Sequence, residues 1–188
     1  MTREQLISHV EATQKAFRRF LVALCCGDTS LADDIAQESY IKAYLSCDTF
    51  SNLDKFNAWI FKIGYNTFIN NKRGERLTVG IDDAKDITAH DSADSSFAYQ
   101  DLYEALNRIP AKERTSVLLF YMQGYSIKEI AEIQETSQNA VKQQGLRAFE
   151  TVFSKIRQLI SVYQRVNGGQ AFLRHFRSFL PYNRSSPA

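Results

Sequence analysis

Apolar residues recur at helical spacing through the N-terminal part of the chain. Over residues 3–26, successive apolar positions lie four, seven, four and three residues apart, a spacing that places them on one side of a helix. These positions are Leu6, Val10, Phe17, Leu21 and Leu24. Gly27 and Asp28 are expected to end this first helix.

Two more helices are predicted in the same part of the chain. Ser30 followed by Asp33 resembles a capping box, in which each side chain binds a free backbone N–H, and we expect a helix from there to about Leu45. Its inward positions are Leu31, Ile35, Ala36 and Ala43. A third helix is expected over residues 53–73. One of its sides carries Phe56, Ile60, Ile63 and Thr67. The polar loop CDTFSNLD, residues 47–54, connects the two helices and contains one aromatic residue.

Further along, the chain shows two helices with clear end signals. Residues 102–109 are amphipathic. Pro110 suits the first turn of the next helix, over about residues 111–123, because its missing N–H is a donor that would lack a partner there anyway. Gly124 is expected to end that helix, since glycine readily takes the left-handed conformation beyond a helix end.

The segment that follows has the spacing of a helix-turn-helix. Ser126 with Glu129 forms a second capping box and opens a helix that carries Ile127, Ile130, Ala131 and Ile133. After the three polar residues 135–137, the apolar pattern resumes with Val141, Ala148 and Val152. Two short helices joined by such a turn are typical of DNA-binding proteins.

No strand pattern competes with these helices, so the predicted fold class is all-α, with two small helical domains. Charge divides the chain in the same way: residues 1–76 hold ten Lys/Arg and nine Asp/Glu, residues 77–100 hold one Lys and five Asp, and residues 101–188 hold twelve Lys/Arg and seven Asp/Glu. The middle stretch lacks apolar periodicity, as expected of a flexible acidic linker. We therefore predict domains over residues 1–76 and 101–158, with the linker at 77–100 and a C-terminal extension over 159–188.

Composition narrows the function classes. Hydrophobic residues make up 44% of the chain and charged residues 23%, which suffices for packed cores. The N-terminal residues carry scattered charges and no continuous apolar stretch, so we expect a cytoplasmic protein without signal peptide or membrane anchor. Cys25, Cys26 and Cys47 form no CxxC pair and are interpreted as buried thiols. Because catalytic motifs and metal-ligand spacings are absent from the sequence, we expect no enzyme, no cofactor, no metal and no small-molecule substrate.

Together, the two domains resemble the extracytoplasmic-function (ECF) subfamily of sigma factors, the bacterial subunits that give RNA polymerase its promoter specificity. The polymerase-binding stretch of region 2 is similar to DDIAQESYIKAY, residues 33–44, and the promoter-melting stretch to FNAWIFKIGYNTFINNKR, residues 56–73. Region 4 is similar to LNRIPAKERTSVLLFYMQGYSIKEIAEI, residues 106–133. The resemblance extends to about residue 158 and implies an alternative sigma factor that binds the polymerase core and directs initiation through −10 and −35 recognition.

The resemblance also implies partners. The polar face of the second helix would bind the clamp-helix coiled coil of the largest polymerase subunit, through Asp33, Asp34, Gln37 and Glu38. Region 4 would contact the polymerase flap as well as promoter DNA. The resemblance also suggests an anti-sigma factor as a further partner.

Opening the −10 element needs a pocket for a base that leaves the stack, and contacts that hold the displaced strand. The resemblance places that pocket in the loop over residues 47–54, where Phe50 would stack on the base and Asn52 would hydrogen-bond to it. A core position is the alternative for Phe50, and Trp59 is expected to pack at a helix junction. The strand would be held by Lys62, Asn66, Asn70, Lys72, Arg73 and Arg76.

The second helix of the helix-turn-helix would contact the −35 element through Ser137, Gln138, Asn139, Lys142, Gln143, Gln144 and Arg147. Amide side chains read base edges, and basic ones neutralise phosphates. This segment departs from the family's usual pattern: Glu135 stands where Gly is common, Gln144 where a basic residue is common, and Gly145 where a core Leu is common. Gln134 and Thr136 likewise replace apolar residues. We therefore expect a divergent contact set.

Two other functions stay open. A sigma-like decoy would bind polymerase or an anti-sigma factor without opening promoters, and a helix-turn-helix regulator would bind DNA without polymerase. The C-terminal extension lies beyond the resemblance. Its segment QAFLRHFRSFLPY sets Phe172 and Phe176 on one face, which either folds back over region 4 or binds a partner or a membrane surface.

Overall fold

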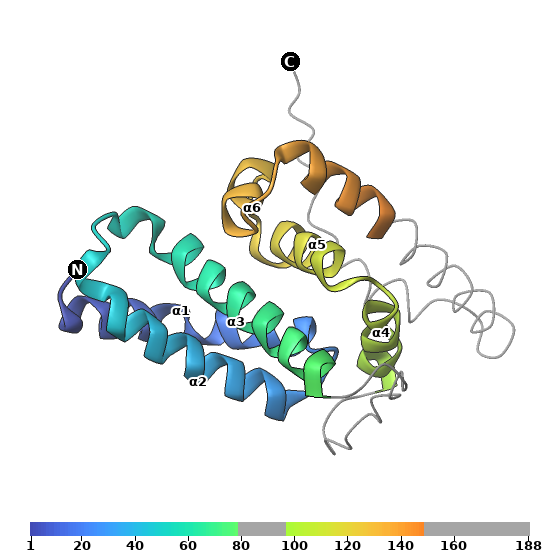
Figure 1. The fold of residues 1–188 in the computed structure, drawn as a ribbon, viewed down its shortest axis with the longest axis horizontal. Coiled ribbons are helices and arrows are strands. Elements are labelled where there is room, and N and C mark those ends of the chain that lie inside the picture. Colours follow the sequence, from blue (N-terminus) through green and yellow to red (C-terminus); the bar gives the residue numbers. More distant parts are fainter. Residues whose placement is uncertain (79–96, 149–188) are drawn as a thin grey trace, which may run out of the picture.

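The computed structural model describes residues 1–78 and 97–148, and every regular element in these two ranges is a helix (Figure 1). The predicted all-α fold is thus confirmed. Helices extend into the stretch expected to be linker, as far as residue 78 and again from residue 97. The remainder of that stretch, Val152 and the C-terminal extension lie outside the described residues. Within the described ranges, no helix combines the length and the apolar character needed to cross a bilayer.

The first lobe is a bundle of α1 (Arg3–Leu24), α2 (Thr29–Ser46) and α3 (Phe56–Thr78). Two short 3-10 turns, η1 (Cys47–Thr49) and η2 (Leu53–Lys55), connect α2 to α3. Gly64 lets α1 and α3 approach closely, because a Cβ at that position would lie 2.7 Å from the Phe17 ring. The fully buried side chains of the bundle include Phe17, Phe20, Leu21, Leu24, Ile35, Ile60 and Phe68.

The second helix does not begin as predicted. Its N-cap is Asp28, whose carboxylate accepts a 2.9 Å hydrogen bond from the backbone N–H of Leu31. The expected capping box of Ser30 and Asp33 is wrong, because Asp33 binds Arg18 of α1 instead. Asp28 provides a cap two residues earlier, so α2 begins at Thr29.

The second lobe consists of α4 (Phe97–Asn107), α5 (Ala111–Gln123), α6 (Ile127–Ile133) and a further helix over residues 138–148. The predicted end signals are confirmed. Pro110 directly precedes α5, Gly124 ends it with φ 74°, and Ser126 and Glu129 form the capping box of α6. The helix-turn-helix is therefore present. It is held together by a core of Leu119, Ile130, Ile133, Val141 and Ala148.

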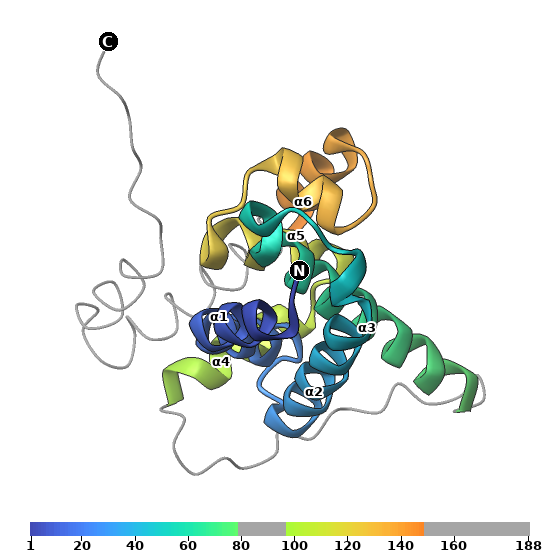
Figure 2. The ribbon, with the colours of Figure 1, turned by 90° about the vertical axis from the view of Figure 1, so that its left-hand side faces the viewer.

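The two lobes pack against each other, α5 against α1 and α6 against α3 (Figure 2). Arg114 of α5 is buried at this contact, where its Nη1 donates to the carbonyl oxygen of Leu24 at 2.7 Å and its Nη2 to that of Ile109 at 3.1 Å. The ring of Tyr103 lies so close to Gly27 that a Cβ on this glycine would be 2.6 Å from it. The arrangement brings the helix-turn-helix beside the first part of α3.

Candidate polymerase and nucleic-acid interfaces

The polar face predicted on α2 is present, but two of its four members have partners within the chain. Arg18 holds the Asp33 carboxylate with bonds of 2.7 and 2.9 Å, which lower the pKa of that carboxyl. Glu38 pairs with Lys42, one helical turn on, at 2.7 Å. Asp34 and Gln37 are exposed. Part of the acidic charge is therefore neutralised before any partner arrives.

The same face of α2 carries apolar side chains that the sequence analysis did not assign. Ile41 is 60% exposed and Leu45 is 76% exposed. Ile41 follows Glu38 by three residues and Leu45 follows Ile41 by four, which places both in line with the exposed acids and amides. Both residues lie outside the inward-facing stripe of α2. Their position outside this stripe could be seen in the sequence, but it does not reveal what covers the two side chains.

The predicted −10 loop places its aromatic residue against α3. The Phe50 ring stacks on the Trp59 ring with centroids 4.3 Å apart and an angle of 14° between the planes. Phe50 is half-buried, whereas Asn52 is exposed. The pair is therefore fixed in orientation at the lobe surface instead of lying deep in the core.

A polar stripe continues from this aromatic pair along α3. Its members, at intervals of three or four residues from Trp59, are Lys62, Asn66, Asn70 and Arg73, so all lie on one helix face. Lys72 lies apart from them, because it lines a cavity of about 460 Å³ at the lobe contact together with Cys26 and Arg114. The side chain of Arg76 lies outside the described residues.

The reading helix over residues 138–148 begins with a cap. The Ser137 hydroxyl accepts a 3.1 Å hydrogen bond from the backbone N–H of Ala140. Arg147 is exposed and lies 3.8 Å from the Glu113 carboxylate. The remaining predicted readers on the open side are Gln138, Asn139, Lys142 and Gln143, all exposed.

Gln144 faces the protein instead. Its Oε1 lies 2.6 Å from the Ser116 hydroxyl, and Gln134 Oε1 lies 3.1 Å from the same hydroxyl. Gln134 also donates to the carbonyl oxygen of Lys112 at 3.0 Å. The two glutamines that depart from the family's pattern thus share one polar network around Ser116. Beside them, a Cβ on Gly145 would meet no atom of the described residues within 4 Å, so this glycine leaves open space.

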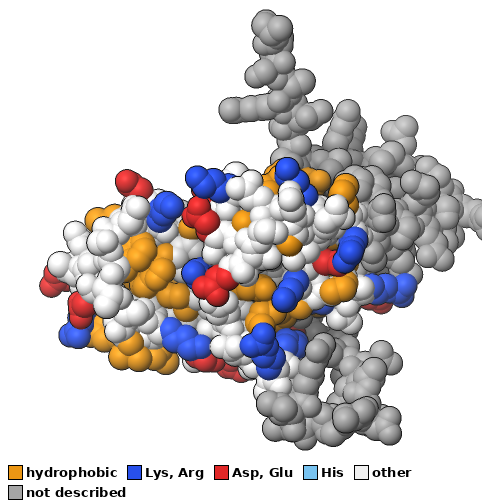
Figure 3. Space-filling view, turned by 45° about the horizontal axis from the view of Figure 1, so that its top comes forward, with side chains coloured by type: hydrophobic (Ala, Val, Ile, Leu, Met, Phe, Trp, Pro, Cys, Tyr) orange, Lys and Arg blue, Asp and Glu red, His pale blue; other side chains and the backbone are white. Residues whose placement is uncertain are grey.

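One predicted −10 contact is already engaged within the chain. Lys62 Nζ lies 2.8 Å from the carboxylate of Glu135, which occupies the turn of the helix-turn-helix with φ 53°. On the face shown in Figure 3, Lys and Arg side chains are interspersed with Asp and Glu and form no single basic field. On this face, an approaching polyanion would therefore meet particular cationic side chains and no single broad positive potential.

Comparison with known proteins agrees with this arrangement. The model of Sigma-70 region 2 matches residues 9–78, and that of Sigma-70, region 4 matches residues 99–152. The chain is 31% identical over 117 residues to the RNA polymerase sigma factor SigV of Bacillus subtilis, an alignment that covers 62% of this chain and 70% of the relative. It is 28% identical over 142 residues to the ECF RNA polymerase sigma-E factor of Haemophilus influenzae, covering 68% of this chain and 75% of the relative.

Solved structures show the same fold. The sigma factor RpoE of Bartonella quintana, in co-crystals with the anti-sigma factor NepR, matches with a TM-score of 0.66 at 24% identity, over 80% of this chain and 95% of that one. CnrH, in complex with the cytosolic domain of CnrY, matches with a TM-score of 0.62 at 19% identity, over 84% of this chain and 90% of that one. With regions 2 and 4 in this order and a relative at 31% identity, the chain belongs to the ECF subfamily of RNA polymerase sigma factors, which bind the polymerase core and promoter DNA and direct transcription initiation.

Proposed function

We propose that the outer face of α2 docks on the clamp-helix coiled coil of the largest polymerase subunit. Exposed acids and amides orient the encounter, and exposed Ile41 and Leu45 supply apolar area to bury. Asp33 and Glu38 contribute less charge than Asp34, because Arg18 and Lys42 already pair with them. The surface consists of Asp34, Gln37, Glu38, Ile41 and Leu45, with Asp33 at its edge.

The −10 element is bound where the loop over residues 47–54 meets α3. The observation that supports this most is the continuity of the surface: the Phe50–Trp59 stack stands at one end of the polar stripe over Lys62, Asn66, Asn70 and Arg73. A base that leaves the duplex needs an aromatic platform, and the strand beside it needs hydrogen-bond donors and cations. Both are supplied here by one helix and its preceding loop.

The −35 element is read by the helix over residues 138–148. Gln138, Asn139 and Gln143 present amides to base edges, while Lys142 and Arg147 neutralise phosphates. Gln144 acts as a packing residue, since it is bound to Ser116. The second lobe also contacts the polymerase flap.

The chain acts in the cytoplasm, without catalysis of its own, and is controlled by an anti-sigma factor. The support for this partner is fold similarity to RpoE, which was solved in complex with the anti-sigma factor NepR. An anti-sigma factor that covers either interface would prevent transcription.

The assignment is tested by separating polymerase binding from promoter opening. Ile41→Asp is expected to weaken binding to core polymerase by about tenfold or more, because it places a charge in the apolar part of the interface. The matched control Ile41→Val keeps the apolar surface and should bind normally.

Asn70→Ala should bind core normally but open promoters poorly, as measured by permanganate reactivity of unpaired thymines. Normal core binding by Ile41→Asp, or normal opening by Asn70→Ala, would contradict the corresponding assignment.

A sigma-like decoy would give a different result. It would bind core polymerase in the same assay but show no permanganate reactivity with any variant or with the wild-type chain. A helix-turn-helix regulator would bind duplex DNA and leave core polymerase unbound.

A further inference from the structure

Two ion pairs join the helix-turn-helix to the region 2 lobe at the start of its polar stripe. Lys62 Nζ lies 2.8 Å from Glu135, and Lys55 Nζ lies 3.3 Å from Glu132. The lysines belong to η2 and α3, and the glutamates belong to α6 and the turn after it. The carboxylates therefore stand beside lysines that a DNA phosphate approaching this end of α3 would contact.

We propose that Glu135 is an intramolecular latch, which stands in for a DNA phosphate on Lys62 and keeps the −10 surface closed in the free chain. This inference rests on the proposed −10 surface. It adds a role for the turn of the helix-turn-helix that −35 reading does not require.

The backbone at Glu135 supports this role. This residue follows α6 with φ 53°, a left-handed conformation that glycine adopts freely and that is strained for a residue with a Cβ. A glycine here would remove the strain but also the carboxylate. The ion pair with Lys62, which lowers the pKa of Glu135, gives a reason for a charged side chain at a position where it is sterically unfavourable.

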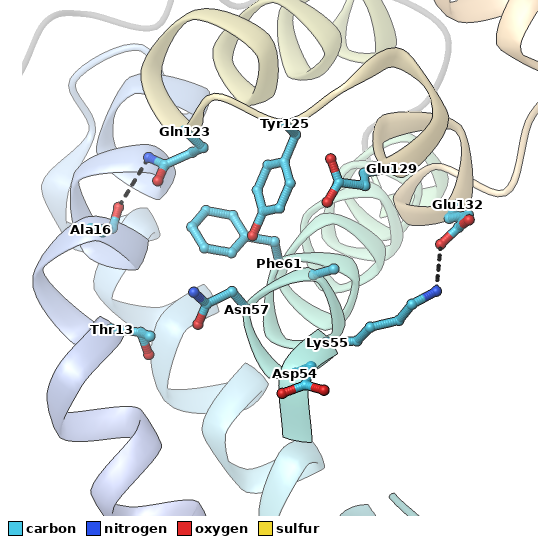
Figure 4. Close-up of a pocket in the computed structure, with 11 residues that line it drawn as sticks. Thr13, Ala16, Asp54, Lys55, Asn57, Phe61, Gln123, Tyr125, Glu129 and Glu132 are labelled. Carbon is cyan, nitrogen blue, oxygen red and sulfur yellow. Dashed lines mark hydrogen bonds and ion pairs between the residues drawn. The ribbon is translucent and has the colours of Figure 1, made fainter. Parts of the chain in front are cut away.

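The contact between the lobes is not closely packed around Lys55 and Glu132. A cavity of about 270 Å³ lies between the lobes. Figure 4 shows Tyr125 pointing toward Phe61 and Gln123 toward the backbone of Ala16. The ring centroids of Phe61 and Tyr125 are 5.6 Å apart, and the hydrogen bond from Gln123 to Ala16 is 3.5 Å long. Both ion pairs are substantially exposed, so each is expected to favour closure by no more than a few-fold.

In this proposal the chain exchanges between a closed and an open arrangement, and the ion pair at Glu135 favours the closed one. The Glu135 carboxylate beside Lys62 neutralises its charge and repels a DNA phosphate that approaches it, so closure competes with the −10 strand. Polymerase favours the open state if its binding separates the lobes, because a ligand shifts such an equilibrium by its differential affinity for the two states. Removal of the latch should have the same effect without polymerase.

The test uses the full chain without polymerase. A short fluorescein-labelled single-stranded DNA of mixed sequence reports strand binding by anisotropy, and small-angle X-ray scattering reports the radius of gyration. Glu135→Gln and Glu135→Gly should each bind the strand about two- to fivefold more tightly than wild type and show a larger radius of gyration. Glu104→Gln removes an exposed carboxylate from α4 in the same lobe and controls for the change in net charge.

Affinities and radii equal to those of Glu104→Gln would overturn the latch. A charge swap, Lys62→Glu with Glu135→Lys, should restore the compact radius, and failure to do so would also count against it. These outcomes are separable from the −10 assignment. The Glu135 variants can show an unchanged radius of gyration while permanganate reactivity on core polymerase stays normal, and this result rejects only the latch. Loss of strand binding in every variant rejects the proposed −10 surface as well.

Discussion

At the scale of single residues, Arg114 is the main buried polar link between the lobes. It is 8% exposed, and its guanidinium reaches the carbonyl oxygens of Leu24 and Ile109 as well as the Cys26 sulfur. Its Nε has no hydrogen-bond partner among the described residues, and burial lowers the pKa of the guanidinium. Charge-assisted bonds to carbonyl groups hold such a cation in place, and they require the planar fork that only arginine has.

Arg114→Lys should therefore destabilise the chain. One ammonium cannot replace donors that point to two carbonyl groups on different segments, and we expect the free energy of unfolding to fall by about 1 to 3 kcal/mol. Urea unfolding followed by circular dichroism measures the change. Arg108→Lys, at an exposed position nearby, is the matched control and should unfold like wild type. Equal unfolding of both variants would show that the buried hydrogen bonds of Arg114 contribute nothing.

At the scale of elements, helix ends could be predicted because their signals are local. Ser126 and Glu129 are three residues apart, and Gly124 needs only its own backbone to end α5. The Ser30–Asp33 capping box failed because a distant residue, Arg18, binds the Asp33 carboxylate. The −10 stripe was visible as a spacing along α3. The ion pair between Lys62 of this stripe and Glu135 could not be predicted, because it joins side chains from separate lobes.

The reading helix also shows what sequence patterns miss. Gln144 has the side chain of a base reader, but it is bound to Ser116 on α5. Ile41 and Leu45 were visible as apolar residues outside the inward stripe of α2, a position that indicates exposure but gives no signal for the partner that covers them. In both cases the tertiary arrangement decides whether a side chain faces a partner or the protein.

Substitutions of exposed residues on the helix over residues 138–148 should affect DNA affinity and sequence preference separately. Lys142→Ala is expected to weaken binding to all promoters by a similar factor and to reduce the salt dependence of binding, because it removes one phosphate contact. Gln143→Ala is expected to change which −35 sequences are preferred. Selection from a randomised −35 library, followed by titration at two salt concentrations, measures both. Gln144→Ala serves as the comparison, since its side chain faces Ser116 and its preference should stay close to wild type.

At the scale of the whole molecule, the proposed function divides the work of initiation between two helical lobes. In this proposal the first lobe offers a polymerase face on α2 and a strand-binding face along α3, and the second offers the helix over residues 138–148 to the −35 element. The lobes meet through a buried arginine on one side and through exposed ion pairs around a cavity on the other. The exposed side is the weaker, so we expect opening to begin there, next to the −10 surface.

Run-off transcription with purified bacterial core polymerase on a library of promoter fragments tests the central claim most directly. The chain should direct transcripts from defined start points on a subset of fragments, with no transcript from core alone. If the chain neither co-elutes with core polymerase at low salt nor yields any defined transcript, the account of this protein as a promoter-opening sigma factor is contradicted.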